Sequence, residues 1–167
     1  DLKNNVFRAG YPQDYITKST HVDYLGKDLS EYQHIVDEIT DFIEKIIPIK
    51  TLNKYFWDHL ASSLIGENRN QSFNIYRGSG SNGKSLFTEL MEYVLGEYYG
   101  SVPVNLITDK RTAIGGTSSE IMALKGVRYA VLQEPTKGMQ MNEGLMKQLT
   151  GDSKMQGRAL YSETESF

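Results

Sequence analysis

QSFNIYRGSGSNGKS, residues 71–85, carries the strongest structural signal in this sequence. Apolar residues alternate at its start, and the chain then reads Gly78-Ser79-Gly80-Ser81-Asn82-Gly83-Lys84-Ser85. This run, called the phosphate loop below, matches G-x-x-x-x-G-K-S/T at every specified position. Because Leu86, Leu90 and Tyr93 follow at helical spacing, we expect a strand, a glycine loop and a helix in this order.

The chemistry of the loop follows from its residue types. Glycines let the backbone curl so that N–H groups point at phosphate oxygens, and the N-terminal end of a helix adds partial positive charge. Lys84 is expected to reach the β- and γ-phosphates, and the Ser85 hydroxyl to bind Mg²⁺. We therefore predict a Mg-ATP site along the whole phosphate loop. The alternative is an ordinary surface turn rich in glycine and serine.

Composition narrows the functional classes. The 167 residues are 39% hydrophobic and 23% charged, as in a globular protein, and the net charge of −3 argues against a surface adapted throughout to nucleic acid. The net charge is still compatible with a local basic strip that binds nucleic acid. The chain has no cysteine, which excludes disulfides and thiolate metal sites. It also has no run of 18 apolar residues, so we expect no membrane contact.

The part before the loop reads as helical. Residues 1–28 have few periodic cues and are expected to form an irregular lead-in. A first helix is predicted from Ser30, with Gln33 completing a capping box, to Pro48. A second is predicted over 51–65. Their apolar stripes are Ile35, Ile39, Phe42, Ile43, Ile46 and Ile47, and Leu52, Phe56, Leu60 and Leu64. We predict a small helical domain over 1–70 and an α/β core over 71–167.

The part after the loop alternates strands and helices. The loop helix should end near Gly96, a strand should follow over 102–107, and Thr117 with Glu120 forms a second capping-box pattern. Residues 127–132 predict a strand buried on both faces. Glu134 lies just beyond its C-terminal end, where α/β sheets bind ligands, so we expect it to hold the metal or polarise the attacking water.

The last stretch predicts a short helix capped by Asn142, a polar turn, and one arm of a hairpin in KMQGRALY. Lys154 and Arg158 lie on this arm. Two cations on an exposed arm are compatible with DNA contact or with a merely solvated face.

Three ordered blocks, YRGSGSNGKS, LKGVRYAVLQEP and NEGLMKQLTGDSKMQGRALY, together resemble the superfamily 3 helicases, specifically the poxvirus-type primase-helicases of large DNA viruses and phages. DYITKST and LIGENRNQSFNIYRGSG also resemble the segment leading into the ATPase core of that family. The resemblance covers residues 10–167. It implies an AAA+-like P-loop core with a parallel sheet, an intracellular homo-hexamer that hydrolyses ATP and draws single-stranded DNA through its pore, and a fused or associated primase.

In family terms Glu134 lies in the second ATPase motif and residues 147–158 match the third, which implies DNA contact by Lys154 or Arg158. The sequence departs from the family twice. Gln133 replaces a frequent second carboxylate, so Glu134 is expected to serve both roles, and Thr150-Gly151-Asp152-Ser153 replaces a common Thr-Gly-Gly-Asp. The family's next strand and its trans-acting arginine would lie beyond Phe167. We thus expect an incomplete core that binds nucleotide better than it hydrolyses it.

Other functional classes stay open. A P-loop kinase would need a lid over an acceptor substrate, and a GTPase-like switch would need an N-K-x-D stretch; neither is evident in the sequence. A third class is an assembly module that uses nucleotide only to hold a ring together.

Overall fold

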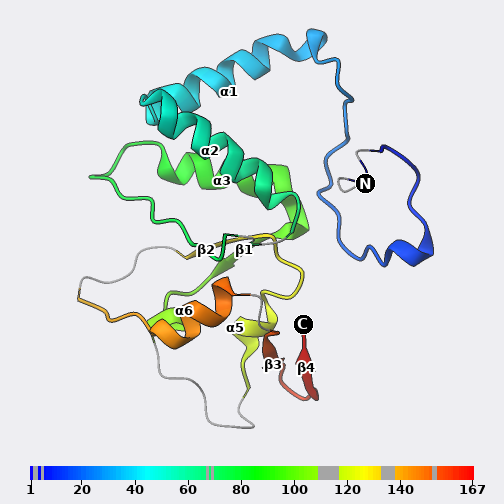
Figure 1. The fold of residues 1–167 in the computed structure, drawn as a ribbon, viewed down its shortest axis with the longest axis vertical. Helices are drawn as coiled ribbons and strands as arrows, with labels where there is room; N and C mark the ends of the chain where they lie inside the picture. The colour runs from blue at the N-terminus through cyan, green and yellow to red at the C-terminus, as the bar shows by residue number, and fades with distance from the viewer. Residues whose placement is uncertain are drawn as a thin grey trace. The chain divides into compact units, whose positions relative to one another are not determined.

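The computed structural model describes residues 1, 4, 6–66, 68, 70–108, 117–132, 138–151 and 154–167. These residues form two compact units (Figure 1). The first contains Asp1–Ile65 and Tyr76–Gly96, and the second Gly66–Ile75 and Glu97–Phe167. The units interleave in sequence, and the predicted domain boundary at residue 70 stays a prediction.

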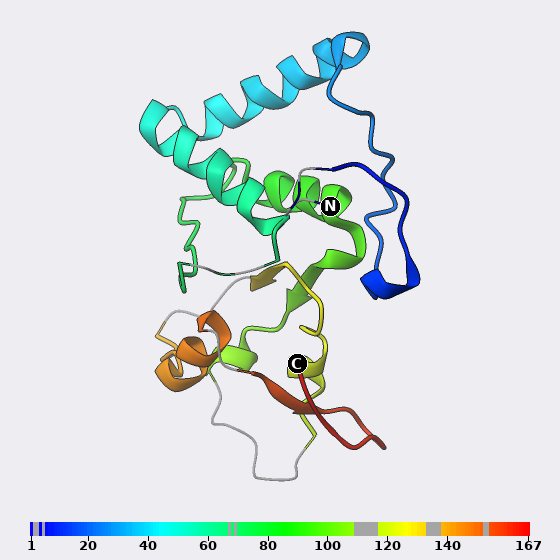
Figure 2. The same ribbon diagram turned by 45° about the vertical axis from the view of Figure 1, so that its right-hand side comes forward.

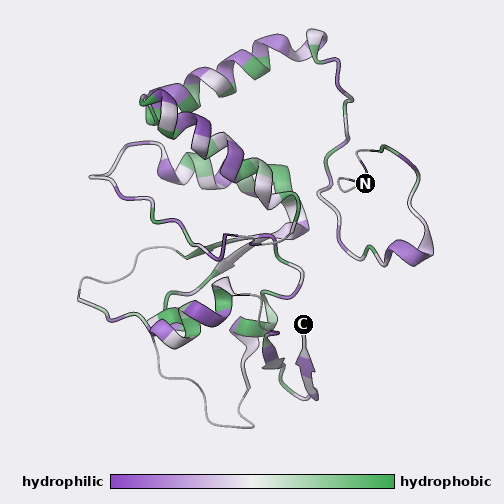
Figure 3. Ribbon diagram, viewed as in Figure 1, coloured by the Kyte–Doolittle hydropathy of each residue, from purple (hydrophilic) through white to green (hydrophobic). Residues whose placement is uncertain are grey.

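A helical hairpin begins the first unit, as expected. Helix α1 spans Gln33–Ile46 and α2 spans Lys50–Ser63, with Pro48 in the turn between them. Hydrophobic and hydrophilic residues alternate along α1 (Figure 3), and Ile43 on its apolar stripe is fully buried. In α2 the buried apolar side chains are Phe56 and Leu60. The spacing of apolar residues therefore predicted both helices, although Ile35, Leu52 and Leu64 of the predicted stripes are exposed.

The start of α1 differs from the predicted capping box. Ser30 lies in a 3₁₀ turn, η2 (Ser30–Tyr32), so that the α-helix begins three residues later. Gln33 does not reach back to Ser30; its side-chain amide donates to Asp37 Oδ1 at 2.8 Å. The predicted pairing is wrong because the i, i+4 partner inside the helix satisfies the Gln33 side chain.

Helix α3 (Lys84–Leu95) follows the phosphate loop and ends at Gly96, as predicted. The predicted buried face of this helix is wrong, because the buried residues lie one or two sequence positions after the predicted ones. Leu86 and Tyr93 are exposed, whereas Phe87, Met91 and Leu95 are buried. Phe87 is buried because it belongs to an aromatic cluster. The centroid of its ring lies 4.8 Å from that of Phe56 on α2 and 5.8 Å from that of Tyr76.

The lead-in also packs within this unit. It contains one short 3₁₀ helix, η1 (Pro12–Asp14), and Arg8 pairs with Asp14 at 2.7 Å. The backbone of Thr20 lies against Gly96, where a Cβ atom would stand 2.4 Å from the Thr20 carbonyl oxygen. This close approach and the positive φ of 51° at Gly96 both favour glycine at the end of α3.

A two-stranded parallel sheet forms the centre of the second unit. Strand β1 (Tyr99–Val102), preceded by the 3₁₀ turn η3 (Gly96–Tyr98), pairs with β2 (Tyr129–Leu132) from Tyr99–Tyr129 to Val102–Leu132. A parallel sheet was expected, but two details differ. The strand predicted over 102–107 is wrong, because β1 lies earlier and ends before Pro103, which cannot donate to the ladder, and 105–108 form a helical turn instead. In β2 Tyr129 is buried while Ala130 is exposed, so burial on both faces is wrong.

The predicted strand before the phosphate loop is absent from the described residues 70–78. Phe73 is 49% exposed and Ile75 73% exposed. A strand needs a neighbour for its backbone groups, and segment 71–77 pairs with none of the described strands. The alternating pattern thus lacks a partner strand.

Short helices and a hairpin complete the second unit. Helices α4 (Asn105–Thr108), α5 (Ser119–Met122) and α6 (Glu143–Thr150) accompany the hairpin of β3 (Gln156–Arg158) and β4 (Thr164–Ser166), which Figure 2 shows near the C-terminus. The predicted Asn142 cap of α6 is confirmed, with its Oδ1 accepting from Leu145 N at 3.1 Å. No helix within the described ranges is long and apolar enough to cross a membrane.

The N-cap of α5 is Ser118, and the predicted Thr117–Glu120 capping box is wrong. Ser118 Oγ accepts from the Arg158 N–H at 2.9 Å, and the Ser118 N–H donates to the Arg158 carbonyl at 2.9 Å. The serine is therefore used to fix the hairpin to α5 rather than to cap the helix with its side chain.

Candidate functional site

The phosphate loop is a left-handed turn that leads directly into α3. The φ angles of Gly80, Ser81 and Gly83 are 98°, 47° and 80°. Positive φ angles cost little conformational free energy for glycine and more for other residues. Two of these three positions, 80 and 83, therefore hold the residue type that the backbone conformation favours. Gly78 to Asn82 are all exposed. The loop is thus curled as predicted and open to solvent.

Lys84 lies over the loop rather than away from it. Its Nζ donates to Asn82 Oδ1 at 2.7 Å and stands 3.0 Å from the position that a Cβ atom on Gly78 would take. Asn82 crosses the loop as well, with its Nδ2 only 1.6 Å from that same position. A side chain at position 78 would push the Asn82 amide aside and crowd the Lys84 ammonium group, and both groups are the far ends of flexible side chains.

The first turn of α3 provides further donors. Gly83 occupies the N-cap position and accepts from the Phe87 N–H at 2.9 Å, while no side chain caps the helix. Ser85 is exposed in this turn. Between residues 78 and 88 the sole charged side chain in the sequence is Lys84. The backbone N–H groups and the Lys84 ammonium group are hydrogen-bond donors of the kind that suits a polyphosphate. The Ser85 hydroxyl oxygen is suited to the metal ion that accompanies it.

Glu134, the predicted partner of the loop, lies outside the described residues, as do Gln133, Asp152 and Ser153. Strand β2 ends at Leu132, two residues before Glu134. Among the described residues no group of three or more His, Cys, Asp and Glu side chains could hold a metal ion. The metal and catalytic roles of Glu134 therefore stay predictions.

The two cations predicted to contact DNA have different environments. Lys154 is exposed just before β3. Arg158 is on β3, where its backbone is held by Ser118, and it is half-buried; within the described part of the chain its Nε is buried without a hydrogen-bond partner. The hairpin arm is confirmed as a structure, but only Lys154 presents the fully exposed cation that was expected.

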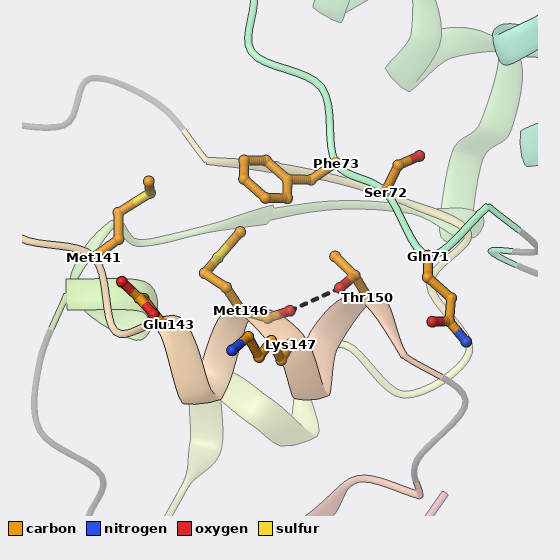
Figure 4. Close-up of a pocket in the computed structure, with 8 residues that line it drawn as sticks. All are labelled: Gln71, Ser72, Phe73, Met141, Glu143, Met146, Lys147 and Thr150. Carbon is orange, nitrogen blue, oxygen red and sulfur yellow. Dashed lines mark hydrogen bonds between the residues drawn. The ribbon is translucent and has the colours of Figure 1, made fainter.

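The sequence patterns did not predict a groove of about 450 Å³ between segment 71–73 and α6 (Figure 4). Met146 extends from α6 toward the ring of Phe73, and Thr150 Oγ1 donates to the Met146 carbonyl at 3.0 Å. The complete lining is Gln71, Ser72, Phe73, Met141, Glu143, Met146, Lys147 and Thr150. Its one carboxylate and one ammonium offset each other, so this groove is less suited to phosphate than the loop is. No periodicity marks it in the sequence, because its two walls are far apart along the chain.

Comparison with known proteins finds relatives among viral proteins. No protein-family model matches the chain. It is 36% identical over all its 167 residues to putative helicase L207/L206 of Acanthamoeba polyphaga mimivirus. It is 32% identical over 152 residues, 90% of the chain, to putative helicase 184R of Invertebrate iridescent virus 6, and 26% identical over 126 residues, 75% of the chain, to putative primase C962R of African swine fever virus. The chain spans 17%, 16% and 13% of these proteins respectively.

Proposed function

We propose that this chain is the nucleotide-binding segment of an ATP-driven DNA helicase, because the viral proteins that it matches are named putative helicases and a putative primase. The observation that carries the proposal is the position of Lys84 Nζ over Gly78, in a left-handed loop that continues into α3. This arrangement places an ammonium group beside the backbone of an exposed glycine loop and the start of a helix, as phosphate binding requires.

Each residue of the loop has a role in the proposal. Lys84 and the backbone N–H groups of the loop hold the β- and γ-phosphates, and Ser85 with Glu134 holds Mg²⁺. The metal ion, when bound, neutralises charge that develops on the phosphates. Glu134 also orients or deprotonates the attacking water. Positioning and electrostatics are sufficient, because phosphoryl transfer asks little covalent chemistry of the protein.

The proposal extends to the assembly. The active form is a homo-hexamer that hydrolyses ATP between subunits and moves single-stranded DNA through its pore, with a primase fused to it or associated with it. Lys154, and the exposed part of Arg158, contact the DNA backbone. The helicase and primase names of the viral relatives support DNA as the substrate.

The test is ATP hydrolysis by the complete protein, as its gene encodes it, with and without single-stranded DNA. We expect DNA to stimulate hydrolysis, Lys84→Ala to remove both basal and stimulated activity, and Glu134→Gln to retain ATP binding but lose hydrolysis. Nucleotide affinity, measured in parallel with a fluorescent ATP analogue, separates binding from turnover.

Three outcomes would contradict the proposal. Hydrolysis that is indifferent to DNA would favour a kinase or an assembly module. Retained turnover in Glu134→Gln would remove Glu134 from the catalytic site. A protein that stays monomeric with and without nucleotide, measured by light scattering, would exclude the ring.

A further inference from the structure

The side chain of Asn82 occupies the inside of the phosphate loop. Residues on both sides of it, Ser81 and Gly83, have positive φ angles, and the Asn82 side chain lies back across the loop. Its Nδ2 lies over Gly78, and its Oδ1 accepts a hydrogen bond of 2.7 Å from Lys84 Nζ. An uncharged oxygen thus binds the one ammonium group that the loop offers to a phosphate.

We propose that the hydrogen bond between Asn82 and Lys84, called the Asn82 latch below, competes with phosphate for the Lys84 ammonium group and must break when phosphate binds. The inference rests on the proposed function and adds to it an autoinhibitory contact at the same site. Asn82 is in this view a competitor of the nucleotide and not one of its ligands.

The competition follows from geometry. A phosphate that enters the curve of the loop needs the space over Gly78, which the Asn82 amide fills, and needs the Lys84 ammonium, which the same amide engages. Nucleotide binding therefore includes the loss of one charge-assisted hydrogen bond, and the observed affinity is lower than that of an open loop. Because the loop is exposed, water replaces part of this bond and the effect is moderate.

Two substitutions at this position make opposite predictions. Asn82→Ala removes the competing oxygen, and we expect an ATP analogue that is not hydrolysed to bind about fivefold more tightly. Asn82→Asp places a carboxylate beside Lys84, which strengthens the competitor and repels phosphate, so we expect binding at least tenfold weaker than in the wild type. Affinity is measured by fluorescence titration of the complete protein. Asn70→Ala is the matched control, because it removes the same amide from an exposed turn outside the phosphate loop.

A second readout needs no nucleotide. Acylation of Lys84 by an amine-reactive reagent, followed by peptide mass spectrometry, is expected to be at least twofold faster in Asn82→Ala than in the wild type or in Asn70→Ala, because the latch no longer engages the amine. Addition of the ATP analogue should protect Lys84 in all three proteins.

The outcomes separate the latch from the proposed function. If the wild type binds nucleotide and Asn82→Ala binds it equally or more weakly, the latch is overturned and the nucleotide site stands. Unchanged Lys84 reactivity in Asn82→Ala would also overturn the latch. If neither protein binds nucleotide, both proposals are overturned.

Discussion

Gly83 lies directly against Ile46: a Cβ atom on Gly83 would stand 2.6 Å from Ile46 Cγ2. The last glycine of the phosphate loop therefore has a packing role as well as a backbone one, since its φ is 80°. We expect Gly83→Ala to destabilise the protein by about 2–4 kcal/mol, the sum of left-handed strain and overpacking against α1. Urea unfolding, followed by circular dichroism, measures the change.

Two controls separate strain from packing at Gly83. Gly80 has a φ of 98° but open space around its Cβ position, so Gly80→Ala should cost only about 1–2 kcal/mol. In an Ile46→Ala background the clash is removed, and the additional cost of Gly83→Ala should fall to a similar value. A cost that is the same with and without the Ile46 side chain would show that the contact with Ile46 contributes nothing.

The corrected face of α3 makes a second prediction. Phe87 is 2% exposed and its ring contacts that of Phe56, so Phe87→Ala should destabilise the protein by about 3–5 kcal/mol. Leu86, its neighbour in sequence, is 57% exposed, and Leu86→Ala should stay within about 0.5 kcal/mol of the wild type. Thermal and urea unfolding of both variants give the comparison. The reverse order would restore the face that the sequence pattern favoured.

This helix illustrates what sequence patterns can and cannot predict. Gly83 and Gly96 mark its two ends by local chemistry, and both ends were predicted. Its buried face was not. Apolar residues recur at i, i+4 spacing from Leu86 and also from Phe87, and the choice between the two stripes depends on where Phe56 lies. That position is set by contacts distant in sequence.

Backbone pairing and hydrogen bonds between distant segments account for two of the other errors. Phe73 and Ile75 alternate as strand residues do, but a strand forms only where another offers its backbone. Ser118 binds Arg158, forty residues away, and no spacing rule relates these positions. At the candidate site the motif predicted the curl of the loop, whereas the contact between Asn82 and Lys84 follows from side-chain conformations that the motif does not specify.

Stability should depend on pH through His59. This side chain is partly buried on α2, its ring stacks on that of Tyr55 at 6.4 Å, and burial lowers the pKa of His59 below its usual range. On acidification the unfolded chain therefore binds a proton before the folded chain does. The His59 contribution is complete above the unfolded pKa of about 6.5, and it is lost progressively as the pH falls from that value through the lowered pKa of the folded state.

The measurement is the free energy of unfolding in urea at pH 7.5 and pH 5.5. The wild type should lose stability between these values, and His59→Gln should lose less. His34 is exposed on α1, so His34→Gln serves as the matched control and should keep the wild-type difference. If both variants lose as much as the wild type, burial of His59 is not the cause.

The hairpin arm allows a sharper test of DNA contact than reversal of both cations. Arg158→Glu would place a carboxylate where the Arg158 Nε is buried and would disturb the strand that Ser118 holds, so a loss of DNA binding there would have two explanations. Lys154 is exposed and free of this difficulty. If Lys154 neutralises one phosphate, Lys154→Glu should weaken binding of single-stranded DNA. It should also reduce the slope of log affinity against log salt concentration by about 0.7.

The control for Lys154→Glu is Lys27→Glu, which makes the same change of charge at another exposed position. A general electrostatic effect would lower DNA affinity equally in both variants, because each changes the net charge by the same amount. A direct contact would reduce the salt slope in Lys154→Glu alone, with unfolding temperatures unchanged. Equal affinity and equal slope in the wild type and Lys154→Glu would remove Lys154 from the DNA site. Any basic contact would then have to come from elsewhere on the chain.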